Sequence, residues 1–179
     1  MHDKMPVPSG ISINPTEPQI VEAEKLIANL CGHWQGVCRT WFEPGKLADE
    51  SDVTGTMAAV VGGQFLKHQY GGTIQGRPRS GEETWVFNEI TQRWQSAWID
   101  SFHMNGAIMF SEGPATDEGC QVFGQYDVGP GTPPWGWKTL LSLRDPQQLV
   151  ITAFNVSPEG DEALAVETNY RRVAEVGNE

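Results

Sequence analysis

Turn-forming residues recur about every ten residues along this chain, and their spacing constrains the fold more than any other feature. From Gly32 onward, pairs rich in Gly, Pro, Asn and Asp separate short segments, for example at Pro44–Gly45, Gly62–Gly63 and Asp145–Pro146. Within the segments, apolar residues alternate with polar or small ones, which is typical of strands with one buried face. The predicted strands are 33–43, 51–61, 64–75, 81–88, 93–101, 107–115, 120–127, 135–144, 148–156 and 162–172.

Short turns between sequential strands favour an antiparallel up-and-down meander. Closing such a meander into a barrel removes its exposed edges. A barrel of eight to ten strands has an interior wide enough for one small ligand. We therefore predict an all-β fold, a barrel of about ten antiparallel strands.

One helix is predicted ahead of the strands, at residues 17–30. Thr16 can cap it, and Gln19 stands three residues later, as in a capping box. Ile20, Ala23, Ile27 and Leu30 recur at helical spacing, and a glycine follows them as a stop signal. The predicted organisation is a flexible tail at residues 1–16 and a barrel domain at residues 17–173.

The net charge of −11 argues against two classes of partner. A nucleic-acid-binding protein or one that binds an anionic membrane would be expected to carry a basic face, and the 12 Lys and Arg residues are scattered. The first 18 residues contain no apolar run typical of a signal peptide or membrane span. With three cysteines at spacings that fit no metal motif, we expect a cytoplasmic protein without a metal or cofactor.

Gly32-x-Trp34 follows directly after the predicted helix, and this motif resembles the signature of the lipocalins, which are calycin barrels. In those barrels the Trp closes the floor, and an Arg near the end of the last strand packs across it. Arg171 or Arg172 stands at that location here. A guanidinium over an indole is stabilised by about 1–2 kcal/mol when both are desolvated.

A longer resemblance covers residues 30–172. The stretches that carry it are Leu30–Trp41, Gly62–Phe65, Tyr70–Gly72, Gly76–Pro78, Trp98–Ser101, Ser111–Gly113 and Tyr170–Arg172. They resemble a bacterial family of domains of unknown function, number 1579, which implies a calycin-like (lipocalin-like) barrel and no specific activity. Haem-binding barrels of the nitrobindin type share the Gly-x-Trp-x-Gly opening, but their haem-ligating His lies near the end of the chain. This sequence has no His after His103, so a haem role would need His68 or His103 instead.

Three residues are candidate acid–base groups. Asp100 alternates with Trp98, so it faces inward if that indole does, and an interior carboxylate is expected to have a raised pKa. Alternatively, Asp100 caps the turn that follows. His68 shares a face with Tyr70 and can pair with Asp100, or it is an ordinary strand residue. His103 lies in a connection that is expected at the barrel mouth.

Glu83 and Glu112 could also face inward. Glu83 alternates with Trp85, although a solvated position near a turn is the more ordinary interpretation. Glu112 alternates with Phe110, and an inward Glu112 would need a partner such as an Arg.

The sequence is consistent with two functions of different classes. The first is binding of a small apolar or aromatic molecule, with Tyr70, Trp85, Trp98, Met109, Glu112 and Trp137 as ligand contacts. The second is a cofactor-independent lyase, isomerase, cyclase or hydrolase that uses Asp100 with His68 or His103. A filled barrel that serves as an interaction module is a third, structural interpretation. The sequence is also compatible with a homodimer.

Overall fold

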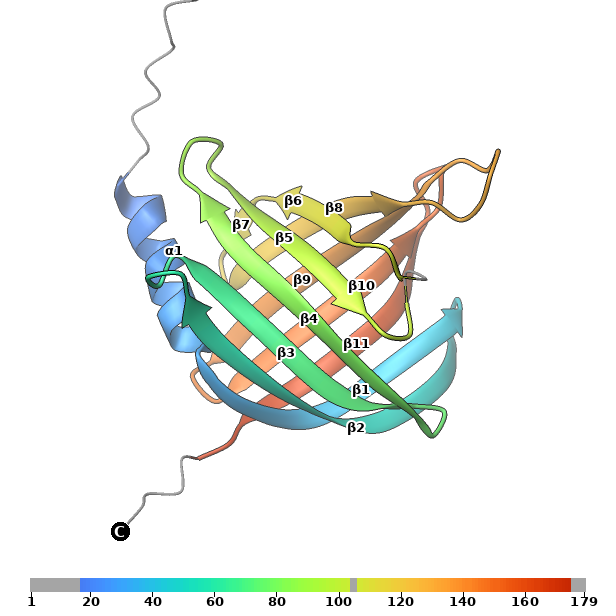
Figure 1. The fold of residues 1–179 in the computed structure, drawn as a ribbon, viewed down its shortest axis with the longest axis horizontal. Helices are drawn as coiled ribbons and strands as arrows, with labels where there is room; N and C mark the ends of the chain where they lie inside the picture. Colours follow the sequence, from blue (N-terminus) through green and yellow to red (C-terminus); the bar gives the residue numbers. More distant parts are fainter. Residues whose placement is uncertain (1–16, 104–105, 175–179) are drawn as a thin grey trace, which may run out of the picture.

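The protein folds into a closed antiparallel β-barrel with one helix across an end, as a computed structural model shows (Figure 1). The structure describes residues 17–103 and 106–174. The elements are α1 (Glu17–Leu30), β1 (Gly32–Glu43), β2 (Lys46–Val60), β3 (Phe65–Ile74), β4 (Arg77–Asn88), β5 (Arg93–Asp100), β6 (Met109–Gly113), β7 (Ala115–Thr116), β8 (Gly119–Tyr126), β9 (Trp135–Asp145), β10 (Gln148–Val156) and β11 (Glu162–Arg172). The predicted all-β class and the predicted helix are confirmed, whereas Thr16 and the predicted tail lie outside the described residues.

Two strand pairings close the barrel. The first and last long strands pair along their length, with Trp34 opposite Arg172 at one end of the β1–β11 ladder. The other closure joins β6 to β8 through two residue pairs, which include Ser111 opposite Gly124. The sheet order is β6-β5-β4-β3-β2-β1-β11-β10-β9-β8-β7, and the two-residue β7 only extends it beside β8. Ten strands therefore form the closed meander that the turn spacing predicts.

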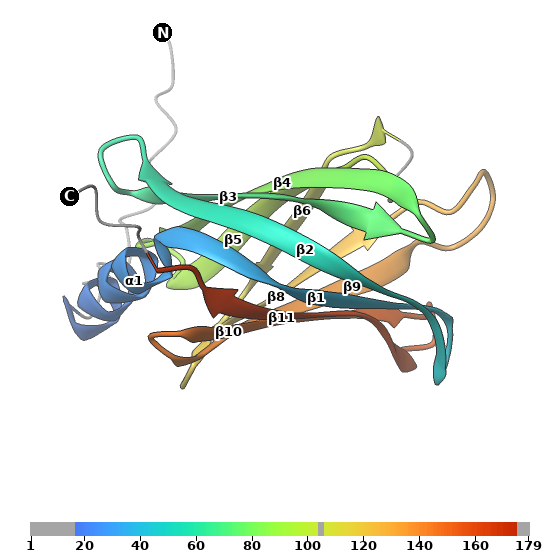
Figure 2. The same cartoon turned by 90° about the horizontal axis from the view of Figure 1, so that it is seen from below.

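The helix and the floor of the barrel occupy one end (Figures 1 and 2). Ala23, Ile27 and Leu30, which recur at helical spacing, form the buried face of α1. Trp34 is 1% exposed, and its indole N–H donates to the carbonyl of Leu30 at 3.0 Å. The guanidinium of Arg172 lies 4.2 Å from the centre of the Trp34 ring, as the lipocalin resemblance implies.

Period-two alternation decides which side chains fill the interior. On β5, Trp94, Ser96 and Trp98 are buried, while the residues between them face outward at least in part. The buried row continues across the sheet, because Trp98 lies opposite Glu83 on β4, and Glu83 lies opposite His68 on β3. Polar side chains therefore share the interior with the core, and they gather where the candidate site is found.

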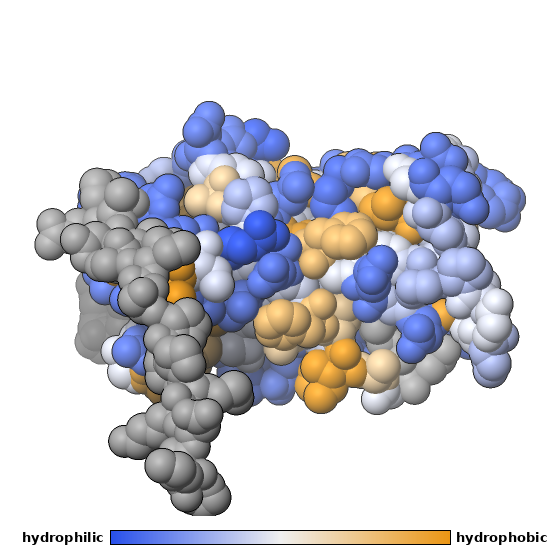
Figure 3. Space-filling view, turned by 90° about the horizontal axis from the view of Figure 1, so that it is seen from above, coloured by the Kyte–Doolittle hydropathy of each residue, from blue (hydrophilic) through white to orange (hydrophobic). Residues whose placement is uncertain are grey.

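The outer face over β5, β6 and β8 carries exposed apolar side chains (Figure 3). Ile99, Phe110 and Phe123 are 45%, 57% and 40% exposed, and we call these three residues the outer apolar patch.

No helix among residues 17–103 and 106–174 has the length and hydropathy needed to cross a bilayer.

Candidate functional site

A pocket of about 930 Å³ opens at the end of the barrel opposite α1. We call it the mouth pocket. Its walls come from the mouth ends of strands and from the connections after β5 and β8, and they comprise Thr40–Phe42, Trp98, Phe102, His103, Ala107, Ile108, Gln125–Gly129, Pro134, Trp137, Asn155 and Ala165. Its volume lies in the range typical of sites for small organic ligands. The described residues that line it include Asp127 but neither lysine nor arginine.

Two stacked indoles form the inner wall of the mouth pocket. The Trp98 and Trp137 ring centres lie 5.5 Å apart, and the ring planes differ by only 17°. The His103 ring packs against both, at 5.6 Å from Trp98 and 5.9 Å from Trp137. Both tryptophans are 8% exposed. Large, rigid aromatic faces of this kind suit a planar ligand, because offset stacking adds about 0.5–1.5 kcal/mol beyond burial.

Behind this wall lies a second, smaller space of about 50 Å³, which we call the inner cavity. Trp98 and Trp137 line it from the mouth side, so the two cavities share these indoles as a common wall. The other polar residues that line it are His68, Tyr70, Arg79, Glu83, Thr139, Thr168 and Tyr170. The apolar ones are Val53, Ile151, Ala153 and Val166.

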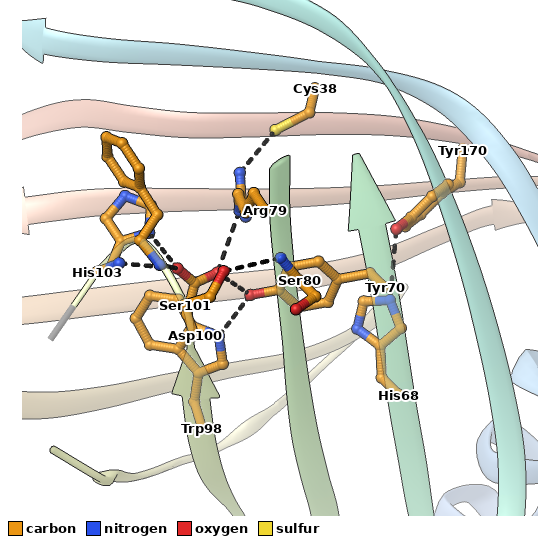
Figure 4. Close-up of polar contacts among 11 residues, drawn as sticks. Cys38, His68, Tyr70, Arg79, Ser80, Trp98, Asp100, Ser101, His103 and Tyr170 are labelled. Atoms are coloured by element: carbon orange, nitrogen blue, oxygen red, sulfur yellow. Dashed lines mark hydrogen bonds and ion pairs between the residues drawn. The ribbon is translucent and has the colours of Figure 1, made fainter. Parts of the chain in front are cut away.

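A hydrogen-bond network centred on Asp100 holds the Trp98 indole in place (Figure 4). The Tyr70 hydroxyl donates to Asp100 Oδ2 at 2.6 Å and accepts the indole N–H of Trp98 at 2.7 Å. Arg79 Nε donates to the same carboxylate oxygen at 3.1 Å. The other oxygen, Oδ1, accepts the backbone N–H of His103 at 2.8 Å and contacts the imidazole Nδ1 at 3.1 Å.

The expectation of a raised pKa for Asp100 is wrong. Burial by itself would raise the pKa, but the hydrogen bonds from His103 and Tyr70 and the positive charge of Arg79 outweigh it. The pKa of Asp100 therefore lies well below its ordinary value. The carboxylate also caps the turn after β5, because the backbone N–H of Phe102 donates to it at 2.7 Å. Both interpretations of the residue hold: it faces inward, and it caps.

His68 faces the inner cavity but does not pair with Asp100, whose side-chain partners are Tyr70, Arg79 and His103. Its Nε2 lies 3.4 Å from the Tyr170 hydroxyl. Its Nδ1 has no hydrogen-bond partner among the described residues, although the side chain is buried. Burial, with the charge of Arg79, lowers the pKa of His68 to about 3, so the imidazole is neutral at pH 7. A cavity of about 50 Å³ has no room for a haem beside it.

Glu83 is buried, 8% exposed, and it lines the inner cavity instead of lying in solvent near a turn. It shares the inward face of β4 with Trp85, while its neighbour Glu82 faces outward and pairs with Lys67 at 2.7 Å. Burial raises the pKa of Glu83 to about 8. The carboxyl group is therefore mostly protonated, and uncharged, at pH 7.

With this geometry established, comparison with known proteins gives the family. A model described as "Protein of unknown function (DUF1579)" matches residues 20–172. The chain belongs to the DUF1579 family. A search of curated proteins found no match.

Two solved structures resemble this DUF1579 protein across most of its length. Rv2717c from M. tuberculosis is 12% identical with a TM-score of 0.59, and the match covers 85% of this chain and 98% of that chain. The S-type phycobiliprotein lyase CPES from Guillardia theta is 11% identical with a TM-score of 0.55, and the match covers 89% of this chain and 99% of that chain. At these identities the similarity shows the barrel fold alone.

The DUF1579 barrel places the expected ligand contacts in different surroundings. Trp98 and Trp137 line both cavities, and Tyr70 lines the inner one. Trp85 and Met109 are buried core residues that line neither cavity. Glu112 does not face inward: its side chain is 44% exposed on the outer surface and pairs there with Arg93 at 3.3 Å.

Sequence reasoning missed four polar residues of the inner cavity: Arg79, Thr139, Thr168 and Tyr170. A signal existed for Arg79, which alternates with the inward Glu83 and Trp85 and extends their face toward the mouth. Among residues 17–103 and 106–174, no group of three or more His, Cys, Asp or Glu side chains could hold a metal ion.

Proposed function

We propose that this DUF1579 protein binds a small planar aromatic molecule in its mouth pocket, against the stacked Trp98 and Trp137. The parallel indoles that separate the mouth pocket from the inner cavity are the observation that carries this proposal. A mobile pair of aromatic rings would lose freedom on binding, whereas Trp98 is already fixed by its hydrogen bond to Tyr70. Preorganisation of this kind lowers the entropic cost of binding.

Charge narrows the class of ligand to uncharged or cationic aromatics. The mouth pocket presents the carboxylate of Asp127, and no lysine or arginine among the described residues lines it. An anion that entered the pocket would lose its hydration, and no lysine or arginine there would compensate for that loss. Thr40 supplies a polar contact, because its hydroxyl is buried at the pocket wall and has no partner among the described residues.

The geometry weighs against the enzyme that uses Asp100 as its acid or base. Asp100 accepts from Tyr70 and Arg79 and from two backbone N–H groups, and its pKa is lowered, so it is a poor proton acceptor at pH 7. The same contacts suit a positioning role for Trp98. The lyase activity named for the Guillardia theta structure belongs to that protein.

Titration with N-phenyl-1-naphthylamine, an uncharged probe whose fluorescence rises in apolar sites, tests the proposal. The probe should bind the wild type, and Trp98→Phe and Trp137→Phe should each weaken binding roughly 5- to 30-fold, equivalent to about 1–2 kcal/mol. Trp85→Phe is the matched control, since it removes a buried indole that lines neither cavity.

A second probe tests the charge argument. The anionic relative 8-anilinonaphthalene-1-sulfonate has the same aromatic skeleton and should bind at least about tenfold more weakly. Equal affinities of the wild type, the two wall variants and the control for the uncharged probe would refute the proposal, provided that thermal melts show all four proteins folded.

A further inference from the structure

We propose that the inner cavity is a second binding subsite, which takes one small uncharged hydrogen-bonding group carried by the aromatic ligand. A hydroxyl, carbonyl or carboxamide group is of the right chemistry. This inference rests on the proposed function of the mouth pocket and specifies the substituent that the aromatic ligand carries.

The first support is an unpartnered polar side chain that lines the cavity. His68 is 3% exposed, and its Nδ1 lacks a partner among the described residues. Buried polar atoms are nearly always hydrogen-bonded, so an orphan that lines a cavity indicates a missing partner. The hydroxyl groups of Thr139 and Thr168, both buried, line the same space and add donors and acceptors.

The second support is close packing that preserves this polar surface. A Cβ atom on Gly55 would lie 2.8 Å from the Tyr170 hydroxyl oxygen and 3.1 Å from His68 Nε2. A Cβ atom on Gly81, which lies on β4, would be even closer to the Tyr70 hydroxyl oxygen. Glycines at these two positions let both tyrosines approach the backbone, and both tyrosines line the cavity.

The third support is charge balance, which selects an uncharged group. Arg79 is the one cation that lines the cavity among the described residues, and it is paired with Asp100 at 3.1 Å. His68 and Glu83 are uncharged near pH 7 for the reasons given above. A charged substituent would therefore lose its water without gaining a counter-ion.

Size and position fix what can reach the subsite. About 50 Å³ exceeds the roughly 30 Å³ that one water molecule occupies in the liquid, so the cavity takes a group of only a few heavy atoms. Trp98 and Trp137 line both cavities, so a ring held against them in the mouth pocket lies next to the inner cavity.

Displacement of N-phenyl-1-naphthylamine by three matched compounds tests the subsite. Naphthalene has no polar group, 2-naphthamide has an uncharged one and 2-naphthoate a charged one. At pH 6.5 the amide should bind wild type at least about tenfold more tightly than either of the others. Thr139→Val and His68→Phe should abolish that preference and leave naphthalene affinity unchanged. Thr84→Val, on the outward face of β4, is the matched control.

A pH series provides an independent test through Glu83. The titratable groups that line the cavity with Glu83 are His68 and Tyr70 on β3, Arg79 on its own strand and Tyr170 on β11. Cys120 on β8 also lies near Glu83, and Asp100 on β5 contacts Tyr70. Because ionisation of Glu83 removes the proton that its carboxyl group can donate to the amide carbonyl, amide affinity should fall roughly tenfold from pH 7 to pH 9. In Glu83→Gln the affinity should stay flat over this range.

Failure of the subsite and failure of the proposed function give different results. Equal affinity for naphthalene and 2-naphthamide, or a crystal structure of the amide complex with only an ordered water in the inner cavity, would overturn the subsite and leave the mouth pocket standing. If N-phenyl-1-naphthylamine itself does not bind, the proposed function fails. An amide preference that survives in both Thr139→Val and His68→Phe would also overturn the subsite.

Discussion

Replacing Glu83 by Gln should stabilise the protein in a strongly pH-dependent way. Below pH 4.5, the ordinary pKa of a glutamic acid, the carboxyl is protonated in both the folded and the unfolded state. As the pH rises from there to about 8, the unfolded chain releases the proton and the folded chain keeps it. Each pH unit in that window lowers the free energy of unfolding by about 1.4 kcal/mol, so the wild type loses about 3–5 kcal/mol in all.

Gln cannot ionise, so the variant escapes this loss. Urea denaturation followed by tryptophan fluorescence should show the two proteins within about 1 kcal/mol of each other at pH 5 and the variant more stable by about 3–5 kcal/mol at pH 8.5. Glu82→Gln is the control, since that side chain is exposed and its pKa is lowered by hydrogen bonds with Lys67 and Gln69. A difference between Glu83→Gln and wild type that does not change with pH would refute the reasoning.

Three further changes have defined outcomes. Tyr70→Phe leaves the Trp98 indole N–H without its acceptor and removes a donor to Asp100, so urea denaturation should show a loss of about 2–4 kcal/mol. Trp34→Ala removes a floor residue that is 1% exposed, and it should cost about 3–5 kcal/mol while leaving the affinity for N-phenyl-1-naphthylamine unchanged. Gly81→Ala drives a methyl group into the Tyr70 hydroxyl and should lower stability by about 1–3 kcal/mol in the same assay.

The elements that local pattern determines were predictable from the sequence. The helix boundaries follow from apolar residues at helical spacing and a glycine stop, and the ten barrel strands follow from turn spacing. The contact between Trp34 and Arg172 joins residues from opposite ends of the chain, and only the family resemblance pointed to it.

The surroundings of a side chain were less predictable, because they depend on register and on distant partners. An inward Glu112, on the same face as Phe110, was one interpretation of the sequence, but Met109 and Ser111 on the same strand are the buried residues. Both faces of this short strand carry apolar residues, so its pattern fits either register. For Asp100, the groups that lower its pKa include Tyr70 and Arg79 on neighbouring strands, and no local pattern reports them.

The central claim is that an uncharged aromatic molecule lies against the Trp98–Trp137 wall. A crystal structure of the protein with N-phenyl-1-naphthylamine tests it most directly. The account predicts the naphthyl ring in the mouth pocket, stacked on one of the two indoles. A probe found instead on the outer apolar patch of Ile99, Phe110 and Phe123, with the mouth pocket free of it, would contradict the claim.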